Sequence, residues 1–482
     1  MNHLKRIITS NRFLPAVFIF FALQAVFYAG YIGFGIPSDE NYHYGSIQYY
    51  ADQPLATGPF THDQDPSTIP IVRAIDRSPN YLFHYVMSFP LRLMEALHLD
   101  MHMQVIFLRL IDVVFGVLAL YVLKKCLDEI SSDKLIKNFT IFAVSVTGMA
   151  VWLPGAINYD NLANLLFLLF VWVCTRFIKK PTAAKTLLLL TLAPATVITK
   201  STFSPILLVG LTAMVYFAWK KRFTPKVFWG QLTAALKARK IVIILLVLST
   251  LLFGGLFFER DVVNLARYHS VRPSCTEFFS VDECRTYNVF NRNYKQKRIY
   301  TPEAKSYLVS QFDPISFTGE WIYGMYNTLF FQLGDRRFES AAANRVFAFI
   351  MLVVIAVTAF FARAKLRLSK AGWFVMGTAA FYVLMLYAYN LNTFFGIGQK
   401  YAYQGRYLLP VIGFVYFFFI LMVVNTYRNR NPKRRQAFGF AWLAVTAMFI
   451  LMHFPPMLLA RYTAHGNPSW RETFVLPKEV ID

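Results

Sequence analysis

The chain has 482 residues, of which 56% are hydrophobic and 17% aromatic, and its formal net charge is +23. Apolar runs of roughly 20 residues recur along it, which excludes a soluble globular protein and predicts an all-α, polytopic membrane protein. The charge does not indicate a nucleic-acid-binding protein, because Lys and Arg gather in short clusters between the apolar runs rather than along one face.

The first apolar run, from Phe13 to Ile36, predicts a membrane anchor, since it is too long for the core of a signal peptide and no cleavage site of small residues precedes the polar region. Lys5, Arg6 and Arg12 precede this run, so the amino terminus is expected in the cytoplasm. The segment 37–102 that follows is rich in acids and is expected outside, with an amphipathic helix over 80–97.

The later apolar runs predict ten further spans, at 103–123, 138–153, 162–178, 186–199, 203–219, 241–258, 346–361, 373–389, 407–424 and 438–454. With the first run this gives about 11 spans, and every basic cluster then falls on one side of the membrane. The carboxyl terminus is therefore expected on the extracytoplasmic side. No repeat or linker divides the chain, so we expect one membrane domain with two larger extracytoplasmic segments, 37–102 and 259–341.

The four cysteines fall into two groups. Cys126 and Cys174 lie at or inside predicted helices, whereas Cys275 and Cys284 share one polar loop. If that loop is extracytoplasmic, a disulfide between them is expected. No Cys and His spacing resembles a zinc site, and acidic clusters could hold a divalent metal ion without any spacing that demands one.

The most informative stretch follows the first apolar run and reads Ile36-Pro37-Ser38-Asp39-Glu40-Asn41-Tyr42-His43-Tyr44. A proline ends the helix, and two adjacent carboxylates then stand where the chain leaves the bilayer. Carboxylates at that depth are expensive unless they have partners or take part in chemistry. The stretch predicts the mouth of an active site, and the alternative is that Asp39 and Glu40 only mark a solvated helix end.

Polar residues with reactive potential recur on the same predicted side of the membrane. They are Asp39, Glu40, His43, Arg73, Arg77, His84, Asn158, Asp160, Lys200, Arg267, Lys400, Gln404 and Arg406. If the outer helix ends surround one cavity, carboxylates among cations suit a reaction that takes a proton from one partner and leaves negative charge on another. A soluble nucleotide donor is not expected, because the sequence holds no Walker loop, dinucleotide fingerprint or GxSxG elbow.

Several short motifs together carry a resemblance to a known family. They are Pro37-Ser38-Asp39-Glu40, Arg77-Ser78-Pro79-Asn80-Tyr81, Arg109-Leu110-Ile111-Asp112, Asn158-Tyr159-Asp160, Thr199-Lys200 and Gln404-Gly405-Arg406-Tyr407-Leu408-Leu409-Pro410. In this order along the chain they resemble GT-C glycosyltransferases, membrane enzymes that use polyprenyl-phosphate sugars. The resemblance covers the chain to about residue 220 and the late helix. It is weak across 259–341, where such families choose acceptors.

The resemblance implies roles for particular residues. Asp39 would be the catalytic base, with Glu40 as the alternative, and Lys200 and Arg406 would hold the lipid phosphate unless they are snorkelling cations at helix ends. Arg109 and Asp112, one helical turn apart, are expected to form a structural ion pair. Asn158 and Asp160 would support the substrate or cap a helix, and His43 and His84 are expected to form interfacial hydrogen bonds. Further candidates for substrate binding are Gln404, Lys400, Tyr407, His43 and Arg77.

The implied function is an inverting hexosyltransferase of the bacterial inner membrane. It would move a sugar from polyprenyl (undecaprenyl) phosphate to a hydroxyl of a cell-envelope glycan. The length and modest external segments are similar to those of O-antigen-modifying glucosyltransferases, so the O-antigen of lipopolysaccharide is the first acceptor expected. The alternatives are a transporter or flippase of lipid-linked sugars, and a glycan polymerase or ligase.

Overall fold

The computed structural model describes residues 2–37, 39–52, 79–277, 279–285, 312–330, 368–397 and 402–429, with short pieces between 290 and 447. This part of the chain is helical except for two short antiparallel strands, β1 (Gln332–Leu333) and β2 (Arg336–Arg337). Arg77 and almost all of the predicted spans 346–361 and 438–454 lie outside the described residues.

Seven described helical segments are long and apolar enough to cross a membrane. They are Phe13–Tyr31 (α2), Met101–Ile130 (α5), Tyr159–Lys179 (α8), Ser201–Lys220 (η2, Ser201–Phe203, with α10, Ser204–Lys220), Lys240–Tyr268 (α12, Lys240–Phe257, with its continuation), Lys370–Gly396 (within α19, Lys370–Ile397) and Gly405–Arg428 (η5, Gly405–Leu408, with α20, Leu409–Arg428). Each of these segments corresponds to one predicted apolar run, and the first ends at Tyr31, before the predicted end at Ile36. The prediction of a polytopic helical membrane protein is confirmed, whereas the count of about 11 spans stays a prediction.

Two further predicted runs form less regular elements. The run 138–153 is a broken helix made of α6 (Lys134–Ser145), α7 (Gly148–Trp152) and η1 (Leu153–Gly155), bent by 72° at the break. Thr147 occupies that break, and its hydroxyl contacts the Ala143 carbonyl oxygen at 2.9 Å and the Tyr416 hydroxyl at 3.0 Å. The two contacts of the Thr147 hydroxyl satisfy polar groups that the broken helix would otherwise expose. The second run, 186–199, is α9 (Ala183–Thr199), which has 17 residues.

One predicted boundary is wrong. The polar segment expected from Glu259 begins later, because α12 continues through a π-helical turn, η3 (Phe258–Val262), into α13 (Val263–Tyr268). Arg260 in this turn is buried, and its guanidinium lies 4.2 Å from the centre of the Tyr81 ring. The sequence places charged residues there, but their burial against an aromatic ring lets the helix run on.

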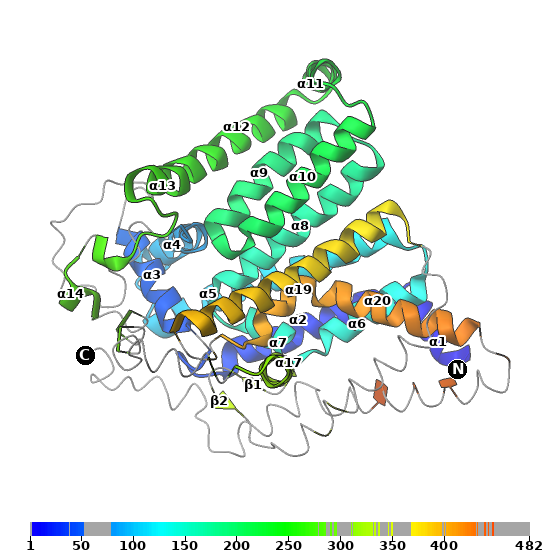
Figure 1. Cartoon of the computed structure of the whole chain (residues 1–482), viewed down its shortest axis with the longest axis horizontal. Helices are drawn as coiled ribbons and strands as arrows, with labels where there is room; N and C mark the ends of the chain where they lie inside the picture. Colours follow the sequence, from blue (N-terminus) through cyan, green and yellow to red (C-terminus); the bar gives the residue numbers. More distant parts are fainter. Residues whose placement is uncertain are drawn as a thin grey trace.

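The remaining helices lie around these segments. They are α1 (Asn2–Thr9), α3 (Glu40–Asp52), α4 (Leu82–Ala96), α11 (Pro225–Ala238), η4 (Cys275–Glu277), α14 (Val281–Arg285) and α17 (Pro314–Phe330). The predicted amphipathic helix over 80–97 corresponds to α4, which keeps Pro90 inside it. In Figure 1, α8, α9, α10 and α12 form one group, and α2, α5, α6, α19 and α20 form another beside it.

Helices α5 and α8 run parallel and fix the two ends of the bundle. Their C-terminal ends are joined by an ion pair between Lys179 and Glu129 at 2.6 Å. At the start of α8, the backbone amide of its N-cap residue Asn158 donates to the carboxylate of Asp112, which lies in the N-terminal half of α5, at 3.2 Å. The N-terminal end also gathers α3 and α4, whereas Arg428 at the end of α20 pairs with Asp133 near the opposite end. The predicted polar residues of separate loops therefore meet at one end of the molecule.

Candidate functional site

The loop between α2 and α3 gives two adjacent carboxylates different surroundings. Gly35 has a φ of 76°, and a side chain there would lie 2.5 Å from the Asn41 amide oxygen, so the tight loop requires glycine. Asp39 has a φ of 65°, a conformation that aspartate tolerates better than most residues. The loop turns back on itself, and the Gly35 amide donates to the Glu40 carboxylate at 3.0 Å.

Glu40 is fully buried and has all its acceptor positions used. Its two oxygens accept from Nε and Nη2 of Arg109 at 2.8 and 2.7 Å, which is a bidentate pair. They also accept from the backbone amides of Gly35 and Ile157 at 3.0 and 3.1 Å. A carboxylate held by four donors and closed to solvent is a structural group, so the alternative of Glu40 as the catalytic base loses its support.

Arg109 joins the end of α2 to α3 and α5. Beyond Glu40, its guanidinium donates to the carbonyl oxygens of Ala29, Ile32 and Gly33 at 2.9, 2.7 and 3.3 Å. All five of its N–H groups therefore have acceptors, and they satisfy carbonyls that the end of α2 leaves without helical partners. Glu40, Arg109 and these three carbonyls are called the brace below.

The expected ion pair between Arg109 and Asp112 is wrong. Asp112 is buried and accepts from the Asn158 amide instead, while Arg109 turns to Glu40. A buried arginine needs an anionic partner, and the sequence offered Asp112 as the nearest one. The tertiary structure brings Glu40 closer, because the end of α2 and the start of α3 fold over the N-terminal half of α5.

Asp39 lies beside the brace but faces solvent. Its side chain is 52% exposed, and its Oδ2 accepts a hydrogen bond from Nη2 of Arg406 at 2.5 Å. Burial is the largest single influence on the pKa of Asp39 and raises it, but the charge and hydrogen bond of Arg406 and the other positive charges nearby together outweigh burial, so the pKa lies below its usual value. The group is thus an accessible carboxylate, and it becomes a stronger base whenever Arg406 turns to another anion.

The placement of Arg406 depends on the glycine before it. A side chain at Gly405 would lie 2.4 Å from the backbone nitrogen of Leu329, so only glycine lets η5 approach α17 this closely. The Gly405 amide also donates to the Thr328 hydroxyl at 2.5 Å. Arg406 is buried, with its guanidinium 5.2 Å from the centre of the Tyr407 ring. The motif around Gly405 thus delivers a cation from late in the chain to Asp39.

Lys200 stands where α9 ends, and it is buried rather than extended to the membrane surface. Its ammonium nitrogen lies 2.5 Å from Oδ1 of Asp160 and between the rings of Tyr159 and Tyr407, at 5.1 and 4.8 Å from their centres. A snorkelling lysine would have its charged head in water, so that alternative is wrong for Lys200. Asp39, Arg406, Lys200, Asp160 and Tyr407 are called the mouth below.

Asn158 caps the helix that begins beside the mouth, which confirms the capping alternative for it. Its side-chain oxygen accepts from the amide of Asp160 at 2.9 Å. Asp160 lies in the first turn of α8 and is committed to Lys200, while its Oδ2 has no hydrogen-bond partner among the described residues. Asp160 therefore holds Lys200 in place with one oxygen and leaves the other to a further donor.

Two buried histidines stand behind Asp39. His43 Nδ1 and His84 Nε2 lie 2.9 Å apart, and the His43 ring centre is 4.8 Å from that of Tyr159. Burial lowers the pKa of His43 to about 3 and that of His84 well below its usual value. Both rings are neutral at neutral pH. They form the expected hydrogen bond, but with each other and out of contact with solvent.

Other predicted residues stand apart from the mouth. Lys400 pairs with Glu320 at an exposed position, whereas Asp39 pairs with Arg406, so Lys400 stands apart from the mouth. Gln404 precedes η5, and its side-chain oxygen has no hydrogen-bond partner among the described residues. The Cys275–Cys284 disulfide is confirmed. Cys126 and Cys174 are buried free thiols.

The sequence reasoning gave no role to Tyr159. Its ring is close to both groups: the ring centre lies 5.1 Å from the Lys200 ammonium nitrogen and 4.8 Å from the centre of the His43 ring. The available signal was its place inside the motif Asn158-Tyr159-Asp160, whose other two residues were already candidates. Among the described residues no three His, Cys, Asp or Glu side chains come together as a metal site.

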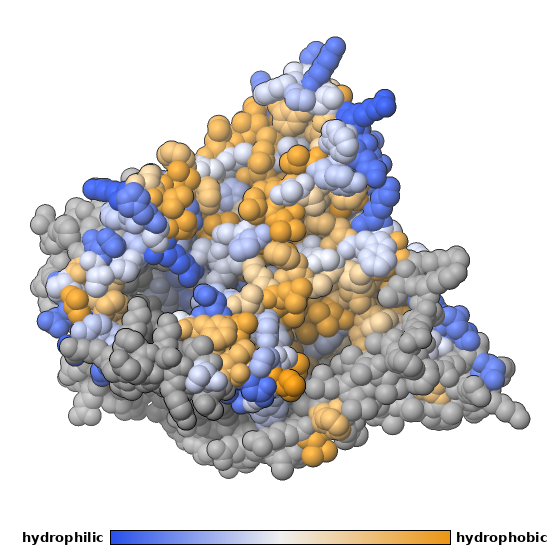
Figure 2. All heavy atoms as spheres, viewed as in Figure 1, coloured by the Kyte–Doolittle hydropathy of each residue, from blue (hydrophilic) through white to orange (hydrophobic). Residues whose placement is uncertain are grey.

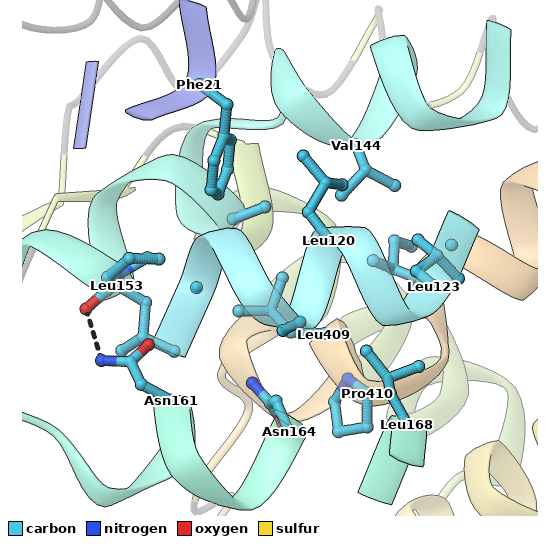
Figure 3. Close-up of a pocket in the computed structure, with 16 residues that line it drawn as sticks. Phe21, Leu120, Leu123, Val144, Leu153, Asn161, Asn164, Leu168, Leu409 and Pro410 are labelled. Carbon is cyan, nitrogen blue, oxygen red and sulfur yellow. Dashed lines mark hydrogen bonds between the residues drawn. The ribbon is translucent and has the colours of Figure 1, made fainter. Parts of the chain in front are cut away.

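An apolar cavity lies within the helix bundle. Figure 3 shows Asn161 and Asn164 of α8 and Leu409 and Pro410 of α20 around it. None of the five mouth residues lines the cavity, and Asn161 and Leu409 are close to Asp160 and Arg406 only in the sequence. The rest of its lining is apolar: Phe21, Gly116, Ala119, Leu120, Leu123, Val144, Ala150, Leu153, Pro154, Leu168, Ile412 and Gly413.

No protein-family model matches this chain, and no curated protein matches it significantly. The arrangement itself can do definite chemistry. An accessible carboxylate can accept a proton, and two buried cations beside it can stabilise an anion that forms in the same pocket.

Proposed function

We propose that the protein is a GT-C-type inverting glycosyltransferase that uses a polyprenyl-phosphate sugar. The observation that carries the proposal is the mouth: Asp39 and Arg406, 367 residues apart, form an ion pair, and Lys200 shares the cluster through Tyr407. These residues come from motifs that resemble the family in sequence. Their meeting at one end of a membrane-embedded bundle supports the proposal.

The reaction fits the charges of the mouth. The acceptor hydroxyl oxygen bonds to the anomeric carbon, and the bond from that carbon to the phosphate oxygen breaks on the opposite face, which inverts the configuration. The hydroxyl proton passes to Asp39, which becomes neutral, and the departing polyprenyl phosphate gains one negative charge. Arg406 loses its charged partner at that step and can pair with the phosphate, so the net charge of the pocket is unchanged.

Lys200 supplies the second cation for the phosphate. Its ion pair with Asp160 keeps it charged and in place, and the rings of Tyr159 and Tyr407 hold it from two sides. Planar aromatic side chains near such a site also suit stacking against a sugar ring.

The orientation belongs to the same proposal. Basic clusters at the opposite end of the bundle suit the cytoplasmic side of a bacterial inner membrane, and a disulfide at Cys275–Cys284 suits an oxidising compartment. With about 11 spans, the mouth would face outward, towards a hydroxyl of the O-antigen or another envelope polysaccharide.

The test is transfer by the purified protein in nanodiscs. Undecaprenyl-phosphate hexoses with a radiolabelled sugar are supplied together with lipopolysaccharide or another envelope polysaccharide, and labelled glycan is measured. The proposal expects label in the glycan, with inverted anomeric configuration and release of undecaprenyl phosphate. Label that stays on the lipid would contradict the proposal, and movement of the labelled lipid across the membrane of sealed vesicles containing the protein would then indicate a transporter. A strict requirement for diphosphate-linked oligosaccharide would indicate a polymerase or ligase.

A further inference from the structure

The basic residues at the end of the bundle opposite the mouth fall into two sets. The sets differ in whether acidic side chains of the protein neutralise them. The first set, at the C-terminal ends of α5, α8 and α20 and the start of α6, is paired within the protein. Lys124 and Lys137 both pair with Asp128, at 2.6 and 2.7 Å. Lys179 pairs with Glu129 at 2.6 Å. These cations already have counter-charges and need none from outside.

The second set surrounds α11 and has no acidic neighbour in the sequence. No Asp or Glu occurs anywhere between Asp160 and Glu259. Every cation of the set is exposed, and none takes part in an ion pair among the described residues. The set, which we call the α11 cationic cap, consists of Lys220, Lys221, Arg222, Lys226, Lys237, Arg239 and Lys240.

The geometry of α11 holds these cations at the end of two membrane-crossing helices. Helix α10 ends at Lys220 and α12 begins at Lys240, and both are long enough to span a bilayer. Helix α11 rests on α9 and α12 through its buried residue Leu232, which packs with Leu187 and Ile243. Its inner face is thus occupied, and the cations lie at the depth where a bilayer has its headgroups.

Exposed aromatic residues occur at the same level. Trp219 and Trp229 are 76% and 61% exposed, which is unusual for tryptophan in contact with water alone but typical at a membrane interface. Figure 2 shows hydrophilic residues gathered at the tip around α11, above a broad hydrophobic surface of the adjoining helices. A flat membrane surface fits both features, because its headgroups meet the cations and its acyl boundary meets the aromatic rings.

We propose that the α11 cationic cap binds the anionic headgroups of membrane phospholipids. Phosphate groups of the leaflet at that end supply the counter-charges that the cap does not find among the described residues, and α11 lies in the headgroup layer. The bound lipid fixes the α10–α12 hairpin relative to the membrane. The proposal does not depend on the reaction at the mouth, which lies at the other end of α9.

The test uses the whole protein, reconstituted in vesicles of phosphatidylcholine and phosphatidylglycerol in equal parts. The protein is then released from the vesicles, and native mass spectrometry measures how much phosphatidylglycerol it retains. Replacing Lys221, Lys226 and Lys237 together by Gln should reduce retained phosphatidylglycerol by roughly 100-fold, since each charge contributes several-fold. Replacing the same three by Arg keeps the charges and should retain wild-type binding. If the triple Gln variant aggregates in detergent, pairs of these substitutions give the same comparison.

A matched control removes three lysines from the paired set, with Lys124, Lys137 and Lys179 each changed to Gln. The phosphatidylglycerol retained by this variant should fall by less than about threefold, because those lysines are neutralised inside the protein. Equal losses in the two variants, or none in the first, would overturn the proposal. So would displacement of the lipid by soluble glycerol phosphate at equal concentration, which would assign the cap to free phosphate. The proposal would likewise be overturned if the triple Gln variant retained its phosphatidylglycerol but no longer co-purified with an acidic protein that the wild type binds.

Discussion

The brace and the mouth begin at neighbouring residues and differ in almost every physical respect. Glu40 of the brace is fully buried and accepts four hydrogen bonds, whereas Asp39 of the mouth has half of its side chain in solvent and pairs with Arg406. Both carboxylates face an arginine, so charge pairing alone does not distinguish a structural acid from a reactive one. The solvent accessibility of the carboxylate and the number of hydrogen-bond donors around it do distinguish the two.

The difference follows from how the chain turns between them. The brace ties the end of α2 to α5, so it sets where the loop begins, and Asp39 leaves that loop in a left-handed conformation. Arg406 then reaches Asp39 from an element near the other end of the chain. A rigid structural pair thus supports a neighbouring pair that has room to change partners.

Breaking the brace should have the largest effect. Replacing Arg109 by Leu leaves Glu40 buried without its partner and frees three carbonyls of α2, so we expect the protein to lose about 3–5 kcal/mol of stability. Thermal unfolding in detergent would measure this. Replacing Lys400 by Gln removes an exposed ion pair with Glu320 and should cost no more than about 1 kcal/mol. Similar melting temperatures for the two variants would show that the brace is not structural.

Removing the second cation of the mouth should come next. Replacing Lys200 by Met should lower sugar transfer by about 100-fold to 1,000-fold, because one charge that stabilises the phosphate is gone. The single variant leaves Asp160 buried without a partner, so the double variant with Asp160→Asn keeps the pocket neutral and serves as the folding control. Normal transfer by a well-folded double variant would return Lys200 to a structural role.

The next prediction concerns the dependence of stability on pH. His43 and His84 are neutral in the folded protein, and burial lowers both pKa values below that of the unfolded chain. The unfolded chain therefore binds more protons below about pH 6.5, and stability should fall as pH falls from there. Each histidine contributes up to about 1.4 kcal/mol per pH unit. Replacing both by Gln should flatten the melting temperature between pH 7 and 5, and an unchanged slope would contradict this.

The pH dependence of Asp39 has the same sign. Its pKa is lowered in the folded protein, so its ion pair contributes stability above the pKa of the unfolded chain, and this is lost as pH falls through the lowered value. Because the side chain is half exposed, this contribution is small beside that of the histidines.

Much of the membrane architecture could be predicted from the sequence, because apolar runs and basic clusters carry the information locally. The convergence of Asp39, Lys200 and Arg406 could also be anticipated, since helix ends on one side of a membrane share a surface. The partner of Arg109 could not, because a buried arginine needs an acid but the sequence does not say which. The π-helical turn at Arg260 was missed for a similar reason, as only the Tyr81 ring explains how the charge is buried.

The most direct test is sugar transfer by the Asp39→Asn variant beside the wild-type protein and a Glu40→Gln variant, each in nanodiscs with a labelled polyprenyl-phosphate sugar. We expect Asp39→Asn to fold and bind the donor normally while transfer falls by about 100-fold to 10,000-fold, and Glu40→Gln to lose activity only in proportion to its lost folded fraction. Wild-type turnover by a folded Asp39→Asn variant would contradict the account.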